Sequence, residues 1–226
     1  MRYLPTGEWM QKADNYTIHE IGIPSMVLME RAALAAVAVM EQEKINTHRT
    51  LVVCGSGNNG GDGFAVARLL KEKGCDVEAA FIGNEESRSP DCMQQMKIAE
   101  NCGVPVVTTI SRKEYTVIVD AVFGVGLNRE VSGAYAANIK KMNALPGQKV
   151  AIDIPSGICS ATGKVLGTAF SADLTVTFEC EKLGCVLHPA ANMPEKLLPY
   201  PSESAGSFLK KNRVSATHLK NRTCRS

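Results

Sequence analysis

The residues best placed to do chemistry begin with a glycine-dense segment, Gly55-Ser-Gly-Asn-Asn-Gly-Gly-Asp-Gly63. It follows the apolar run Leu51–Cys54 and precedes a helical pattern, so it matches the GxGxxG fingerprint of a dinucleotide-binding turn. Glycines let a backbone approach a ligand closely, and the N–H groups that open the next helix favour phosphate. A plain turn needs fewer glycines, so we interpret the segment as a nucleotide site.

The same fingerprint occurs in hydride-transferring dehydrogenases, where an acidic residue about 20 positions further on holds the ribose. Here Asp76 opens the second predicted strand and Glu78 lies inside it, so neither residue fits that position. The segment also lacks the Lys-Ser/Thr pair of a P-loop. A nicotinamide dehydrogenase therefore stays a weakly supported alternative.

Two aspartates end predicted strands: Asp120 closes the run from Val117, and Asp153 closes the run from Val150. In an open parallel sheet, ligands bind beyond the carboxyl ends of the strands. A single aspartate there often only caps a turn. Two of them beside a glycine-rich loop indicate a shared site, to which Asn59 adds an amide oxygen.

A second glycine-containing loop, Gly124–Glu130, leads into a predicted helix. Its N–H groups could hold a further phosphate and Arg129 could pair with it, although a solvated surface arginine is an equal alternative. Tyr135 is a candidate for substrate binding or a plain helix-surface residue. Lys182 could donate a proton or hold a phosphate, or it could be solvated like most lysines.

The elements that must position these residues alternate between strand and helix. Helical patterns follow the glycine-rich segment and recur over residues 91–102 and 134–144. Apolar runs predict strands at 51–54, 77–82, 106–107, 117–120, 150–153 and 174–178. This alternation predicts an α/β fold with a parallel sheet covered on both faces.

Two more helices are predicted ahead of the sheet. Thr6 is the expected cap of the first, and Ser25 is the expected cap of the second, which runs to about Glu43. The second helix is rich in alanine, which allows close packing against the sheet or a second subunit.

Composition fits one globular domain, with 226 residues of which 45% are hydrophobic. No apolar run reaches the roughly 20 residues that span a bilayer, so we expect no membrane partner. Glu8 interrupts the start of the chain, so we expect no signal peptide. The eight cysteines form no CxxC pair, which favours free thiols in the cytoplasm.

The regular pattern ends near residue 192, so we divide the chain into a domain over 1–192 and an atypical basic tail over 193–226. The tail carries clustered Lys and Arg against the single acid Glu203 beyond position 199. Such tails are usually solvated, and we expect part of this one to be disordered. No aromatic stacking pattern accompanies the charges, so we do not expect nucleic acid as a partner.

Taken together, the motifs GNNGGDG, VDAVFGVGL, DIPSG and KLGCVLHP resemble the NAD(P)H-hydrate epimerase family, also called the YjeF N-terminal domain. The resemblance covers roughly residues 1–191. It implies a Rossmann-like three-layer αβα sandwich with a mostly parallel sheet, usually assembled as a homodimer. The implied activity is the interconversion of the R and S epimers of NADH or NADPH hydrated at ring carbon C6.

The resemblance also implies a potassium ion held by Asn59, Asp120 and Ser156. Amide, carboxylate and hydroxyl oxygens suit such a hard cation. The implied substrate-binding residues are Asn58, Asn59, Gly60, Gly61, Asp62, Gly124, Val125, Gly126, Leu127, Asn128, Arg129, Glu130 and Asp153.

Inversion at C6 requires either the C–O bond to break and re-form or the ring to open and close. A carboxyl group assists both routes, and we expect Asp153 to be that acid/base with Lys182 as its helper. The residues past 192 are too few for the dehydratase domain that often follows in this family, so we expect a separate ADP- or ATP-dependent dehydratase. The alternative is a non-catalytic, dimerising Rossmann-like interaction module, which would not need these site residues together.

Overall fold

The computed structural model describes residues 4–111, 114–187 and 196–200. Its strands form one seven-stranded sheet in the order β3-β2-β1-β4-β5-β6-β7, and every neighbouring pair is parallel. The predicted α/β fold is thereby confirmed. The strands are β1 (Arg49–Cys54), β2 (Asp76–Phe81), β3 (Val106–Val107), β4 (Val117–Ala121), β5 (Gln148–Ile152), β6 (Leu174–Phe178) and β7 (Lys196–Tyr200).

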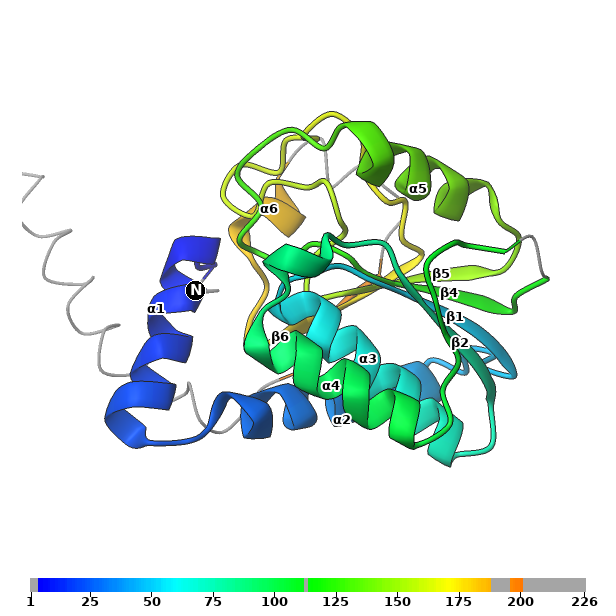
Figure 1. The fold of residues 1–226 in the computed structure, drawn as a ribbon. Helices are drawn as coiled ribbons and strands as arrows, with labels where there is room; N and C mark the ends of the chain where they lie inside the picture. Colours follow the sequence, from blue (N-terminus) through cyan, green and yellow to red (C-terminus); the bar gives the residue numbers. More distant parts are fainter. Residues whose placement is uncertain (1–3, 112–113, 188–195, 201–226) are drawn as a thin grey trace, which may run out of the picture.

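Helices cover both faces of the sheet, as Figure 1 shows. On one face lie α2 (Ser25–Gln42), α3 (Asn58–Glu72) and α4 (Pro90–Asn101), and on the other lies α5 (Gly133–Ala144). The short helices η2 (Glu85–Ser87) and α6 (Leu183–Val186) lie in connections. This is the three-layer αβα arrangement that the sequence predicts.

The core is divided between the two faces by the strand pleat. In β1, Val52 and Cys54 belong to the cluster under α2 and α3, whereas Leu51 and Val53 belong to the cluster under α5. Successive strand residues point to opposite faces, and here both faces are covered. The continuous apolar run of β1 is therefore buried throughout.

The amino-terminal segment departs from this layered plan. Helix α1 (Gly7–Tyr16) stands outside both helix layers, beside the loops at one edge of the sheet (Figure 1). A π-helical turn, η1 (Thr17–Ile21), and the left-handed Gly22 connect it to α2. The predicted side-chain caps are wrong: Thr6 occupies the N-cap of α1 without a side-chain bond. For α2, Ser25 is already helical, because Pro24 takes the N-cap position and its carbonyl accepts from the first turn.

The sheet continues past the expected domain boundary at residue 192. Strand β7 pairs in parallel with β6 inside the stretch assigned from sequence to an irregular tail. Pro199 lies in this strand, which proline tolerates because β7 is at the sheet edge. This strand is difficult to predict from the sequence because it is short and contains a proline. The basic residues of 201–226 lie outside the described residues.

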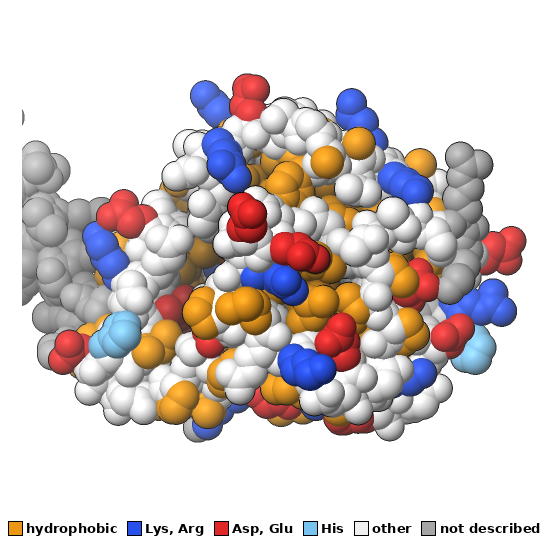
Figure 2. All heavy atoms as spheres, in the orientation of Figure 1, with side chains coloured by type: hydrophobic (Ala, Val, Ile, Leu, Met, Phe, Trp, Pro, Cys, Tyr) orange, Lys and Arg blue, Asp and Glu red, His pale blue; other side chains and the backbone are white. Residues whose placement is uncertain are grey.

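Acidic, basic and hydrophobic side chains are mixed over the face drawn in Figure 2. Within the described ranges, no helix combines the length and apolar character needed to cross a membrane. Seven of the cysteines fall in the described part of the chain, and each is a free thiol there.

Candidate active site

A large cavity opens at the carboxyl ends of the central strands. Its volume is about 1130 Å³, and its walls come from α1, α2, the start of α3 and the segments that follow β4, β5 and β6. The strand order reverses between β1 and β4, and such a switch point is where open α/β sheets bind ligands. The chemistry-bearing loops named from the sequence meet at this edge.

The glycine-rich segment packs against the end of β4. The Gly55 N–H donates to the Ala121 carbonyl over 3.1 Å. A Cβ at Gly60 would lie only 1.9 Å from the Gly55 oxygen, so a side chain there is excluded. At Gly57 a Cβ would meet nothing within 4 Å. Some of these glycines therefore serve chain packing, and Gly57 leaves open space beside the cavity.

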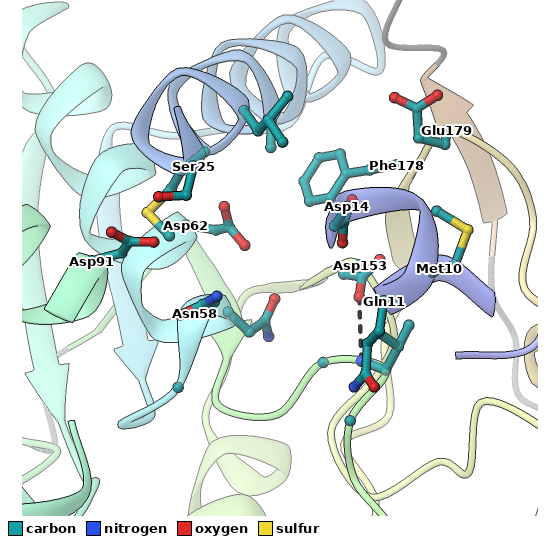
Figure 3. Close-up of a pocket in the computed structure, with 18 of the residues that line it drawn as sticks. Met10, Gln11, Asp14, Ser25, Asn58, Asp62, Asp91, Asp153, Phe178 and Glu179 are labelled. Atoms are coloured by element: carbon teal, nitrogen blue, oxygen red, sulfur yellow. Dashed lines mark hydrogen bonds between the residues drawn. The ribbon is translucent and has the colours of Figure 1, made fainter. Parts of the chain in front are cut away.

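Asp153 and Lys182 form an ion pair in the cavity wall. Lys182 Nζ lies 2.6 Å from Asp153 Oδ1, and the two side chains are 1% and 14% exposed. The N–H of Val125 donates to Asp153 Oδ2 over 3.3 Å, the contact drawn as a dashed line in Figure 3. Asp153 has a left-handed backbone, with φ 69°, because the chain turns directly after β5. Such strain is uncommon outside glycine and often marks functional positions.

Asp120 is completely buried under the cavity floor and bonds to the loop after β5. Its Oδ1 accepts from Ser156 Oγ at 2.7 Å and from the Val122 N–H at 3.1 Å, and its Oδ2 accepts from the Ser156 N–H at 2.8 Å. Burial raises the pKa of Asp120 to about 6, although the Ser156 bonds oppose the shift. Among the described residues, no cation pairs with this carboxyl group.

Asn59 is 8% exposed, yet its side-chain oxygen and nitrogen have no hydrogen-bond partner in the described structure. A Cβ added at Gly124 would lie 3.4 Å from Asn59 Cγ and 3.2 Å from Asp153 Oδ2. The N–H of Phe123, the residue before Gly124, donates to Ser156 Oγ at 2.9 Å. The structure therefore brings Asn59, Ser156 and Asp120 to one neighbourhood.

These oxygens fit a monovalent cation. The orphaned Asn59 amide supplies an unused acceptor, and the buried Asp120 supplies a negative charge without a cation among the described residues. No cluster of three His, Cys, Asp or Glu side chains suited to a metal occurs in the described ranges. Amide, carboxylate and hydroxyl oxygens are the ligand types that suit a hard cation.

The loop after β4 contributes unevenly to the cavity. Its residues from Gly124 to Arg129 line the cavity, whereas Glu130 and Tyr135 do not. The Tyr135 ring instead packs on Phe123, with ring centroids 4.9 Å apart. In the glycine-rich segment, Asn58, Asn59 and Asp62 line the cavity. Gly60 and Gly61 do not line it, and they pack against Gly55 and Met29 instead.

Besides Asp153, the cavity holds Asp62, which the resemblance implies as a substrate-binding residue, and three acidic residues that the sequence did not single out, Asp14, Asp91 and Glu179. Figure 3 shows Asp62 of α3 and Asp91 at the start of α4 on one side, with Asp14 of α1 beside Asp153 on the other. Burial raises the pKa of Asp62 well above its usual range, and the charges of Asp153 and Asp14 add to the shift. Asp14 is exposed to the open cavity, but partial desolvation by the surrounding protein raises its pKa to about 6. The charge of Asp153 also raises the pKa of Asp14, whereas the charge of Lys182 lowers it. Glu179 also lines the cavity.

Helix α1 is held against the site at its beginning. The Pro5 carbonyl accepts from the Leu183 N–H at 3.0 Å, directly after Lys182. A Cβ at Gly7 would lie 2.5 Å from the Val125 carbonyl, so α1 starts in close backbone contact with the second loop. No motif in the sequence predicts this docking, because it depends on contacts between segments far apart in the chain.

Comparisons with known proteins agree with this geometry. A chain from Oenococcus oeni called NAD(P)H-hydrate epimerase is 49% identical over 175 residues, which is 76% of this chain and 83% of that one. One from Weissella koreensis with the same name is 46% identical over 180 residues, 79% of this chain and 81% of that one.

The fold also matches a solved structure. The crystal structure of yeast ynu0, YNL200c, superposes with a TM-score of 0.78 and 21% identity, covering 92% of this chain and 93% of that chain. At this identity the match bears on the fold alone. The family model described as YjeF-related protein N-terminus matches residues 25–184. The chain therefore belongs to the YjeF-related protein N-terminus family.

Proposed function

We propose that the chain is an NAD(P)H-hydrate epimerase, an isomerase that interconverts the two C6 epimers of hydrated NADH or NADPH. The observation that carries the proposal is the Asp153–Lys182 pair in the wall of a cavity whose floor is the nucleotide-type loop before α3. The relatives that bear this name align with 76% and 79% of the chain.

The cavity suits a nicotinamide nucleotide. Its volume, about 1130 Å³, lies slightly above the usual range for small-molecule sites, which leaves room for a large ligand. The amino end of α3, which begins at Asn58, offers N–H groups and a positive dipole to the phosphates. Apolar wall residues such as Leu28 and Phe178 offer contacts to a ring.

Asp153 is the proposed acid/base for C6. Lys182 pairs with the Asp153 carboxyl group and orients it, and Lys182 is itself fixed by Thr177 Oγ1 at 2.7 Å and by the Phe178 carbonyl at 2.8 Å. A group that exchanges a proton at the C6 hydroxyl assists either route of inversion.

We also propose that potassium is the resident cation, held by Asn59, Asp120 and Ser156. When bound, it would supply positive charge under the phosphate-binding loops. The unpartnered Asn59 amide supports this assignment.

A homodimer and a separate dehydratase are further parts of the proposal. Apolar side chains before and on α2 are exposed, with Ile21 at 43% and Val27 at 42%, which supports contact with a second copy. The free thiols of the described residues support a reducing compartment such as the cytoplasm.

The test is a coupled assay. The purified chain is mixed with the R epimer of hydrated NADH and a dehydratase specific for the S epimer, and NADH absorbance is followed with and without potassium. Faster NADH regeneration than with the dehydratase alone supports the proposal. A rate equal to that of spontaneous epimerisation, both with and without potassium, contradicts it.

The main alternative is a non-catalytic, dimerising interaction module. Such a module does not require the buried Lys182 ammonium beside Asp153 or an unpartnered amide at Asn59. The same assay separates the two functions, since a scaffold dimerises without changing the rate.

A further inference from the structure

We infer that Asp14 of α1 is a second catalytic carboxyl group, which works beside Asp153 to open and reclose the hydrated ring. The inference rests on the proposed epimerase function. It concerns a residue outside the stretch that the family model matches, which begins at residue 25.

The two carboxyl groups lie on the same side of the cavity, close enough for the charge of Asp153 to act on Asp14. Both residues line the cavity, and Figure 3 shows Asp14 next to Asp153 on one wall, with Asp62 across the cavity. Helix α1 is not a loose appendage, because the Pro5–Leu183 hydrogen bond and the tight fit of Gly7 hold its first turn. Asp14, two turns further on, is thus presented by a fixed element.

The two carboxyl groups lie in contrasting surroundings. Both oxygens of Asp153 are engaged, one by the Lys182 ammonium and the other by the Val125 N–H. Among the described residues, none forms a hydrogen bond or ion pair with the Asp14 side chain. Asp14 is exposed to the cavity, where a substrate can reach it, and its raised pKa, about 6, lets it hold or release a proton close to neutral pH.

Other charged groups face the same space and define the rival assignment. The basic residues of the cavity besides Lys182 are Arg31 and Arg129, and the acidic ones are Asp62, Asp91 and Glu179. Asp62 is the strongest rival because it faces Asp153 from the opposite wall (Figure 3). Groups on opposite walls suit loss of water from one face of C6 and its return to the other.

Side-by-side carboxyl groups suit ring opening instead, because the hydroxyl oxygen and the ring nitrogen are attached to the same carbon. The Asp153 carboxylate takes the hydroxyl proton, the C6 carbonyl forms, the bond from C6 to nitrogen breaks, and the nitrogen takes the Asp14 proton. Rotation about the C5–C6 bond presents the other carbonyl face. The nitrogen then attacks C6 and returns its proton to Asp14, while Asp153 reprotonates the oxygen. No proton or electron is gained or lost overall.

The first test replaces Asp14 by Asn, which keeps the shape but cannot donate a carboxyl proton. We expect kcat/KM for epimerisation to fall by about 10² to 10⁴. In the unmodified chain Asp14 must be protonated, so kcat/KM should decline as pH rises through about 6, and this limb should vanish in the variant. Asp14→Glu should recover part of the rate.

The matched control is Glu20→Gln, which removes a negative charge from the exposed end of η1, outside the cavity. It should leave both the rate and the pH profile unchanged. If Asp14→Asn keeps the full rate and the same pH limb, the role of Asp14 is overturned while the epimerase proposal stands. If the unmodified chain does not interconvert the epimers at all, both are overturned.

The second test follows the oxygen. Ring opening keeps the hydroxyl oxygen, whereas loss and return of water replaces it at each turnover. Epimerisation in oxygen-18 water, corrected for exchange without protein, should therefore give product that retains its original oxygen. One solvent oxygen incorporated per epimerisation overturns the ring-opening pair and assigns the second group to Asp62.

Discussion

The ammonium nitrogen of Lys182 lies 2.6 Å from Oδ1 of Asp153, and the lysine side chain is almost completely enclosed. Its remaining protons go to Thr177 and the Phe178 carbonyl. A lysine held at this many points cannot swing out to bind a phosphate at the cavity mouth. Its structure is that of a fixed counter-charge for Asp153.

Replacing Lys182 by Met should therefore damage both stability and activity. The aspartate would keep a largely buried charge without its partner, which costs about 3 kcal/mol when a buried pair is broken. The free energy of unfolding can be measured by urea titration. Lys164→Met, at an exposed lysine, is the control and should change little. Combining Lys182→Met with Asp153→Asn should cost less than the sum of the two single changes, and additive losses would contradict the pairing.

Replacing Asp153 by Asn should remove activity while preserving the fold. Asn tolerates the left-handed backbone at this position and matches the carboxylate in size, so the turn after β5 survives. We expect kcat to fall by about 10² to 10⁴, measured in the coupled assay. Asp76→Asn removes an exposed carboxylate at the opposite end of the sheet and should keep the full rate. An equally active Asp153→Asn variant would show that another group does the chemistry.

Potassium should stabilise the folded chain through Asn59. A ligand at one hundred times its Kd adds about 2.7 kcal/mol, so Tm should be higher in potassium chloride than in tetramethylammonium chloride at equal ionic strength. Asn59→Ala removes the unpartnered amide and should abolish the difference. Asn101→Ala, at the exposed end of α4, should keep it. Equal Tm values for the unmodified chain in both salts would speak against the cation site.

Gly60 and Gly57 should respond differently to the same added methyl group. Ala at Gly60 would press into the Gly55 carbonyl 1.9 Å away, and overpacking of this kind costs about 1 to 3 kcal/mol. Ala at Gly57 meets no neighbour and keeps an ordinary extended backbone, with φ −86°. Thermal unfolding of the two variants gives the comparison. A Gly60→Ala protein as stable as Gly57→Ala would contradict the described packing.

The sheet and its central loops could be predicted because local patterns determine them. The buried strand β1, the glycines that follow it and the aspartates after β4 and β5 each carry a signal within a few residues. Parallel strand order then brings Asp120 and Asp153 to one edge. Lys182 stayed open between a site residue and a solvated lysine, because burial to 1% exposure depends on surrounding segments.

The place of Asp14 in the cavity could not be predicted in the same way. Asp14 belongs to a helix whose own pattern shows only a buried stripe, formed by Met10, Ala13 and the following Thr17. Its approach to Asp153 depends on the π-helical turn η1 and on contacts with Val125 and Leu183. The edge strand β7 was missed for a different reason, since a short run with a proline carries little strand signal.

The hydrogen bond between Pro5 and Leu183 has a practical consequence. It joins the segment before α1 to Leu183, which immediately follows Lys182, so a displacement of one segment moves the other. An affinity tag fused in front of Thr6 would therefore adjoin the segment that anchors α1 beside Lys182, and kinetic comparisons between differently tagged preparations should be made only after the tag is removed.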